Sequence, residues 1–247
     1  PSLVGSEMCI RDSLLAAWSS DPLENTGFSD LPGDQLVPKI ALLPNGEAYI
    51  SWFSSEFGNY NVRLQRIDVF GNELWVHNGL LVSDHPSMSW LTDYDLKVDL
   101  DGCAVITFQD VRTGNTNIYA YRISPEGEFL WGDDGIALSN NDFFEPSPKV
   151  AITDSGNSIV AWQRIPEAGN DMIVLQKISP DGDLLWGDGI ILESESGEDY
   201  TRPNLIPSGG DCVILFWFKE SGVPWNPIKH LYCLLYTSDA ADEGLGV

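Results

Sequence analysis

The sequence predicts an all-β repeat protein, and three observations agree on this. A turn glycine recurs at spacings of 56, 54 and 54 residues, and an aromatic residue stands six positions after each of these glycines. No stretch carries a sustained period of 3.6 residues, so little helix is expected. The glycines are Gly46, Gly102, Gly156 and Gly210, and the aromatics are Trp52, Phe108, Trp162 and Phe216.

Three more landmarks follow in the same order in the first three copies. One glycine is followed directly by asparagine, a second is followed four residues later by tryptophan, and a third comes shortly after that tryptophan. The glycines are Gly58, Gly114 and Gly169, then Gly71, Gly127 and Gly182, then Gly79, Gly135 and Gly189; the tryptophans are Trp75, Trp131 and Trp186. Four landmarks in one order across three copies indicate a true internal repeat.

Each copy predicts about four short strands joined by tight turns. In the third copy we expect strands at 149–152, 158–162, 172–178 and 190–192, with 184–186 leading into the last. Gly156 and Gly182 suit turns because glycine adopts a positive φ at little cost, and Pro180 suits the first turn position. The strand segments are rich in residues that favour a pleated surface.

Repeats of this length with four strands are typical of β-propeller blades. A blade cannot bury both faces alone, so large aromatics fill the space between neighbouring blades. We therefore interpret Trp52, Trp75, Trp131, Trp162 and Trp186 as packing residues rather than as a sugar platform. The sequence predicts a partial β-propeller of about three and a half four-stranded blades of ~54–56 residues each.

The two ends of the chain encode the same DNA element on opposite strands. Back-translation of Met8–Ser13 gives a reverse complement that encodes Cys-Leu-Leu-Tyr-Thr, the sequence at 233–237. We identify this element as the mosaic end used in transposase-based library preparation, and we predict that 1–13 and 233–247 are translated adaptor. Between them we predict 14–35 as a lead-in or a strand of an adjoining blade, 36–85, 86–140 and 141–194 as blades one to three, and 195–232 as a truncated fourth blade.

Two long phrases carry a resemblance to a known group of proteins. "YRISPEGEFLWGDDGIAL" (121–138) and "QKISPDGDLLWGDGIIL" (176–192) resemble the propeller repeats of large secreted bacterial proteins, which often carry a sorting domain for type IX secretion. The resemblance implies a secreted or cell-surface location. It concerns the fold and implies no activity.

Charge restricts the class of partner. The net charge is −24; the predicted adaptor ends contribute −1 and −3, which leaves −20. Such acidity repels phosphate backbones, so we expect no nucleic-acid partner. No apolar run approaches the length of a membrane span. An unidentified protein or a glycan is the partner class that remains.

Motifs for common chemistry are absent from the sequence. No histidine pair with zinc spacing, nucleophile elbow or phosphate loop occurs. Clusters at 99–102, 133–135 and 181–183 combine Asp with Gly and could bind calcium. None matches an EF-hand loop, and Asp favours turns for local reasons, so we expect no cofactor, with calcium as the alternative.

Three segments depart most from the repeat: 84–95, 140–146 and 224–227. In the first, the candidate residues are Trp90, Asp93, Tyr94 and Asp95, which could line a glycan-binding groove or supply an acid/base pair. The alternative is an ordinary inter-blade loop whose aromatic residue packs on the rim. No catalytic residue is predicted elsewhere.

Three functions from different classes fit this sequence. We predict a non-catalytic propeller that acts as a scaffold or interaction module of a secreted or surface protein, and therefore no enzyme. The alternatives are a carbohydrate-binding or glycoside-hydrolase-type propeller, and a purely structural spacer. Several loops bringing unrepeated acidic and aromatic side chains to one face would favour the carbohydrate-active alternative.

The adaptor prediction is tested at the DNA level. Long-read sequencing of the source DNA across both junctions should replace the codons of 1–13 and 233–247 with a continuing reading frame. Finding those same codons in the genomic sequence would contradict the prediction, and both ends would then be ordinary protein.

Overall fold

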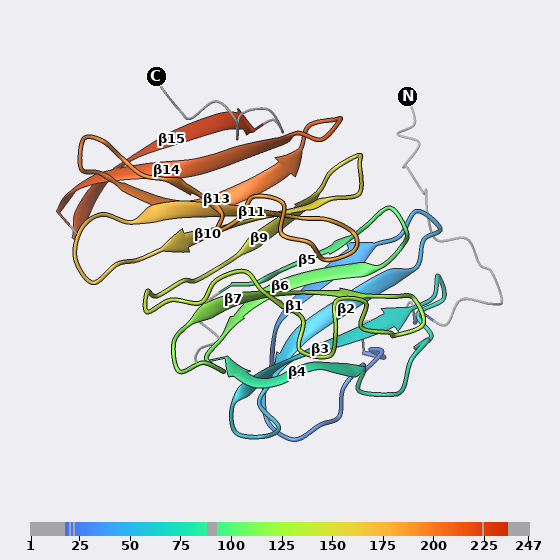
Figure 1. The fold of residues 1–247 in the computed structure, drawn as a ribbon. Helices are drawn as coiled ribbons and strands as arrows, with labels where there is room; N and C mark the ends of the chain where they lie inside the picture. The colour runs from blue at the N-terminus through green and yellow to red at the C-terminus, as the bar shows by residue number, and fades with distance from the viewer. Residues whose placement is uncertain (1–17, 20, 22, 88–92, 224, 237–247) are drawn as a thin grey trace, which may run out of the picture.

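The computed structural model describes residues 18–19, 21, 23–87, 93–223 and 225–236, which form fifteen strands and no helix. Four antiparallel sheets follow one another along the chain, each with its strands in sequence order. The all-β partial propeller predicted from the sequence is confirmed. Figure 1 shows the sheets fanned face to face, with β1–β4 at the bottom and β13–β15 at the top.

The first three sheets are complete four-stranded blades. Blade 1 contains β1 (Gln35–Leu42), β2 (Ala48–Ser54), β3 (Tyr60–Ile67) and β4 (Leu80–Ser87). Blade 2 contains β5 (Asp95–Val98), β6 (Ala104–Asp110), β7 (Asn117–Ile123) and β8 (Ile136–Ala137), and blade 3 contains β9 (Lys149–Ile152), β10 (Ser158–Arg164), β11 (Met172–Ile178) and β12 (Ile190–Leu192).

The fourth sheet has three strands within the described residues: β13 (Asp199–Pro207), β14 (Val213–Val223) and β15 (Asn226–Tyr236). β15 extends four residues into the segment predicted to be adaptor, and Tyr236 packs on Trp186 with ring centroids 5.0 Å apart. The adaptor prediction rests on DNA complementarity, which this packing does not test. It stays a prediction.

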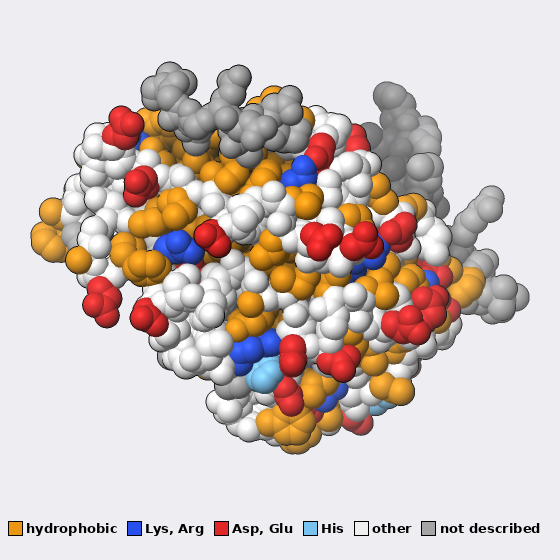
Figure 2. All heavy atoms as spheres, in the orientation of Figure 1, with side chains coloured by type: hydrophobic (Ala, Val, Ile, Leu, Met, Phe, Trp, Pro, Cys, Tyr) orange, Lys and Arg blue, Asp and Glu red, His pale blue; other side chains and the backbone are white. Residues whose placement is uncertain are grey.

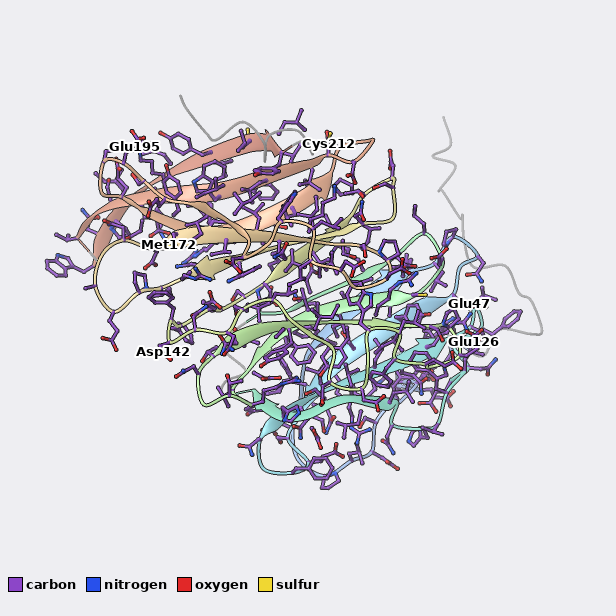
Figure 3. The ribbon with its side chains drawn as sticks, viewed as in Figure 1. Glu47, Glu126, Asp142, Met172, Glu195 and Cys212 are labelled. Carbon is purple, nitrogen blue, oxygen red and sulfur yellow. The ribbon has the colours of Figure 1, made fainter. Side chains whose placement is uncertain are left out.

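The first strand of each blade lies next to the axis. β1 contacts β5, β5 contacts β9, and β9 contacts β13, so these four inner strands line the centre in turn. Each inner strand begins at the end of the molecule marked by Asp142, Met172 and Glu195 and ends near the side of Glu47 and Cys212 (Figure 3). We call the end where the inner strands begin the entry end. We call the opposite end, which carries the turn between the first and second strands of each blade, the turn end.

Blades 2 and 3 each bury one face against the preceding blade and the other against the following blade, and blades 1 and 4 each bury one face against a neighbouring blade. Between blades 1 and 2, Phe53 packs on Tyr94 with ring centroids 4.7 Å apart. Between blades 2 and 3, Trp162 lies fully buried among residues of both sheets, and Trp217 performs the same role between blades 3 and 4. Burial of such large apolar side chains is the main favourable contribution to the stacking of the blades.

A second set of tryptophans fixes neighbouring blades at the turn end. The indole N–H of Trp75 donates to the carbonyl of Pro125 in the next blade at 3.0 Å, and Trp131 donates to Pro180 at the same distance. Trp18 donates to the carbonyl of Val69 at 3.2 Å, which is the equivalent turn position of blade 1. Trp18 thus lies against blade 1 as Trp75 lies against blade 2.

Strand register corrects one predicted repeat residue. Trp52, Phe108 and Trp162 each follow the residue that pairs with an inner strand at the same level, namely Ser51, Thr107 and Ala161. In blade 4 the residue paired at that level is Phe216, opposite Asn204, so the equivalent aromatic is Trp217. The glycine alignment was one residue out because the fourth turn has Asp211 where the others have glycine.

The face of blade 4 that points away from blade 3 is apolar and open. Ile206 is 51% exposed and Leu231 is 67% exposed, whereas the equivalent residues of blade 3, Ala151 and Ile173, are buried by blade 4. Phe216 and Phe218 lie on the same open face.

The packing beneath Trp131 predicts different costs for two glycine substitutions. A Cβ on Gly182 would meet Trp131 and Ile136 at 3.0 Å, whereas Gly187 has open space, and both have a positive φ. We expect Gly187→Ala to cost about 1–2 kcal/mol for backbone strain and Gly182→Ala to cost about 1–3 kcal/mol more for overpacking. Urea denaturation measures both. Equal losses would show that the space under Trp131 is not tightly filled.

Candidate functional site

Three residues at the entry end hold a strained backbone. Val37, Ser147 and Arg202 have φ values of 51°, 55° and 53°, although none is glycine. Each directly precedes a proline, which lies within β1 and β13 and immediately before β9, and the ladder shifts register at this point in β1 and in β13. Strain of this kind costs about 1–3 kcal/mol per residue and is concentrated at functional sites. The strained residues therefore indicate a candidate functional site at the central opening, by which we mean the space around the axis at the entry end of the inner strands.

Blade 2 departs from this pattern at the candidate residue Tyr94. Tyr94 takes the place of proline, and its hydroxyl donates to the carbonyl of Val37 at 2.9 Å and lies 3.0 Å from the hydroxyl of Ser51. The side chain is fully buried, and this burial raises the pKa of its hydroxyl. Tyr94 therefore packs between blades 1 and 2 and supports the strained Val37; it does not line a groove.

Asp93 lies in the central opening, as the glycan-groove hypothesis requires. Its carboxylate pairs with Lys39 at 2.6 Å and with Lys149, and its side chain is 37% exposed. Burial alone would raise the pKa of Asp93, but the hydrogen bonds from Lys149 and Lys39 outweigh it, so the pKa lies below its usual value. Asp93 is therefore ionised at neutral pH.

The other two candidates do not join Asp93. Asp95 accepts hydrogen bonds from Lys97 at 2.8 Å and from the backbone N–H of Val150 at 3.1 Å, which links β5 to β9. Its side chain is 14% exposed and its oxygens are occupied by these donors, so its role is to join two blades. Trp90 lies outside the described residues.

A cavity of about 460 Å³ opens beside Asp93, where the starts of the inner strands of blades 3 and 4 meet the open face of blade 4. One wall is polar and is built from inner-strand residues, and the other consists of two phenyl rings on the open face of blade 4. The lining residues are Asp93, Ser147, Lys149, Gln163, Arg202, Pro203, Asn204, Phe216 and Phe218. The volume lies within the range of small-molecule sites, and the mixture of a few polar groups with aromatic rings is typical of them.

Sequence reasoning missed most of this lining, and one signal would have found it. Pro38, Pro148 and Pro203 stand at equivalent positions of blades 1, 3 and 4, with separations of 110 and 55 residues that match two repeats and one. The residue after each proline is Lys39, Lys149 or Asn204; Lys39 and Lys149 pair with Asp93, and Lys149 and Asn204 line the cavity. A proline that recurs at the repeat spacing and is followed by a polar residue of varying type therefore indicates which residues lie at the central opening.

A second carboxyl group stands behind the polar wall. The side-chain N–H of Gln163 donates to Asp171 at 2.7 Å, and the other end of Gln163 accepts the backbone N–H of Arg202 at 3.2 Å. Burial raises the pKa of Asp171, and the charge of Asp199 raises it further. Gln163 lies between Asp171 and the cavity, so Asp171 positions Gln163 and does not itself line the site.

The acidic cluster at 99–102, for which calcium was the alternative to a simple turn, forms a turn stabilised by its own side chain. Asp99 accepts the backbone N–H groups of Asp101 and Cys103 at 2.9 and 2.8 Å and pairs with Arg122 at 2.6 Å. Among the described residues, no three His, Cys, Asp or Glu side chains gather in a way that could hold a metal ion. Whether the chain binds calcium stays a prediction. In the same part of the chain, no helix could span a membrane.

Comparison with known proteins gives the fold a context. No family model matches the chain, and no curated protein matches it. Among solved structures, it is similar to a Penicillium chrysogenum α-L-arabinanase complexed with arabinobiose, at 15% identity and a TM-score of 0.55, covering 82% of this chain and 62% of the arabinanase. A Fusarium graminearum GH93 α-L-arabinofuranosidase with arabinobiose gives 12% identity and a TM-score of 0.54, with coverages of 81% and 62%. The chain thus spans less than two thirds of either neighbour.

These neighbours correct the predicted function. A non-catalytic scaffold that is no enzyme was expected, but the fold assigned to that scaffold is shared with glycan-cleaving enzymes bound to a disaccharide. The prediction failed because the repeated residues report packing between blades, whereas the residues of a site occur once each and leave no periodic signal. At this identity the likeness shows the fold alone.

The paired state of Asp93 predicts a dependence of stability on pH. Because the folded pKa is depressed, the stabilisation is present above the unfolded value of about 3.9 and is lost as pH falls through the folded pKa. We expect Asp93→Asn to lower the urea midpoint at pH 7, where it leaves Lys39 and Lys149 without their partner, and to have much less effect at an acidic pH below the folded pKa of Asp93. Asp181→Asn, on an exposed turn, is the control. An equal loss at both pH values would mean that Asp93 acts by packing.

Proposed function

We propose that this chain is part of a carbohydrate-active β-propeller of the glycoside-hydrolase type, with the central cavity as its saccharide site. The observation that carries the proposal is the cavity at the entry end, where strained residues of two inner strands and the ionised Asp93 surround one space. The shared fold with an arabinanase and an arabinofuranosidase supports it.

The two walls of the cavity suit the two sides of a sugar ring. Phe216 and Phe218 offer apolar faces to the C–H groups of the ring. Asp93, Gln163 and Asn204 offer acceptors and donors to its hydroxyl groups. A site of this kind fixes the orientation of a saccharide through a small number of placed polar groups, while the apolar contact supplies much of the affinity.

The state of Asp93 limits its chemical role. An ionised carboxylate can accept a proton, attack an anomeric carbon or stabilise positive charge on the ring, but it cannot act as the proton donor. Glycoside hydrolysis uses a second carboxyl group as the acid. Among the described residues lining the cavity, Asp93 is the one carboxylate. The described lining therefore accounts for saccharide binding, whereas hydrolysis requires a second carboxyl group in addition to Asp93.

A location outside the cell belongs to the same proposal. Polysaccharides are large and are met by secreted or surface-displayed proteins. The resemblance of 121–138 and 176–192 to repeats of secreted bacterial proteins supports this location, and with it a type IX route. The described residues add no further support for this location.

The proposal is tested with arabinobiose binding by calorimetry and with release of reducing sugar from arabinan. We expect the full chain to bind the disaccharide and Asp93→Asn to weaken binding at least tenfold, which corresponds to about 1.4 kcal/mol. Phe218→Ala should also weaken binding, and it leaves the Lys39–Asp93–Lys149 cluster in place. Asp181→Asn is the matched control. A folded chain, verified by circular dichroism, that shows neither binding nor hydrolysis would refute the proposal.

A further inference from the structure

The charges around the central cavity differ in sign from the charge of the whole chain. The chain carries a net charge of −24, and acidic side chains outnumber basic ones on the face drawn in Figure 2. The charged residues lining the cavity are two cations, Lys149 and Arg202, and one carboxylate, Asp93. A local excess of positive charge therefore stands at the centre of an acidic protein.

Asp93 does not cancel this excess. Its carboxylate is already shared between Lys39, at 2.6 Å, and Lys149, so the three side chains together carry one positive charge. Two of the three N–H groups of an ammonium remain available after one such pairing. Lys149 can therefore donate to a ligand while it holds Asp93.

Arg202 supplies the second positive charge. Its guanidinium donates no hydrogen bond to the part of the chain that the structure describes, and the residue is exposed. Burial would raise the pKa of Glu220, but hydrogen bonds from Lys229 at 2.8 Å and Thr201 at 2.5 Å lower it, and the charge of Arg202 adds a smaller contribution in the same direction. The fork of donors on Arg202 is thus free to bind a ligand.

The backbone at Arg202 shows that its placement is specific. A φ of 53° is costly for an arginine, and it falls at the register shift between Thr201 and Asn204. Bulges of this kind re-aim a side chain out of the regular pleat. The backbone N–H of Arg202 donates to Gln163, which in turn is held by Asp171, so the strained conformation is braced from blade 3.

We propose that the central cavity takes a carboxylated sugar, a uronic acid unit of an acidic polysaccharide, with its carboxylate bound by Arg202 and Lys149. The proposal rests on the proposed saccharide function of the same cavity. Guanidinium groups bind carboxylates through two parallel hydrogen bonds, which gives both strength and orientation. The two phenyl rings then face the sugar ring, as they would for a neutral sugar. The net charge of the chain repels an anion at long range, so the selectivity comes from these near contacts.

The experiment compares three trisaccharides on the full chain by calorimetry: trigalacturonate, its methyl ester and arabinotriose. We expect the free acid to bind at least tenfold more tightly than its methyl ester, because the ester keeps the ring and removes the charge. Arg202→Gln and Lys149→Gln should each remove most of this advantage, so that the acid-to-ester affinity ratio falls towards one in either variant. Lys229→Gln, which removes a cation outside the cavity, should leave it intact.

The outcomes separate this inference from the function on which it rests. Arabinotriose bound as tightly as trigalacturonate, or equal binding of acid and ester, would overturn the inference and leave the saccharide site standing. A folded chain that binds none of the three would overturn both. An acid preference that survives Arg202→Gln and Lys149→Gln together would place the anion site elsewhere and refute the assignment to this cavity.

Discussion

The bond between an indole N–H and a turn carbonyl of the next blade is the interaction on which the architecture depends. Trp75 and Trp131 each make it at 3.0 Å, and the same carbonyls also accept from Arg66 at 2.9 Å and from Arg122 at 3.4 Å. A hydrophobic interface alone permits neighbouring sheets to slide, because apolar contact is not directional. These hydrogen bonds fix each blade at the turn end, so the inner strands meet around one axis and their starts converge at the entry end.

The recurrence of this tryptophan hydrogen bond explains which features of the fold could be predicted from the sequence. The bond recurs between blades 1 and 2 and between blades 2 and 3, as does the glycine that makes room beneath the tryptophan, so the same residues recur at a constant spacing. Gly127 lies under Trp75 and Gly182 lies under Trp131, and both pairs are visible as a pattern. Fold class, blade length and the packing role of the tryptophans followed from that pattern. The fourth blade departed by one residue because its turn places Asp211 where the others have glycine.

The site could be predicted only in part, for a complementary reason. No single residue type is kept at one register position of the inner strands, which is occupied by Lys39, Asp95, Lys149 and Asn204. Residues that differ at an equivalent position leave no repeat, and residues more than 50 positions apart form no motif. The irregular segment 84–95 revealed Asp93 because it breaks the pattern. An irregular segment can arise either from a functional site or from a different packing arrangement, and the sequence does not distinguish the two. Tyr94, in the same segment as Asp93, is an example of the second, because it is buried between blades 1 and 2.

Net charge is therefore a poor guide to what the centre of this molecule binds. Many carboxylates of the chain are engaged in local structure: Glu145 pairs with Arg164 at 2.5 Å, and Asp110 pairs with Arg112 at 2.5 Å. Others lie on turns at the surface, where water and salt screen them beyond about 10 Å. A ligand in the central cavity is close to Arg202 and far from most of this acidity. The field that it meets is set by the few side chains within a few ångströms, and these are, on balance, positive.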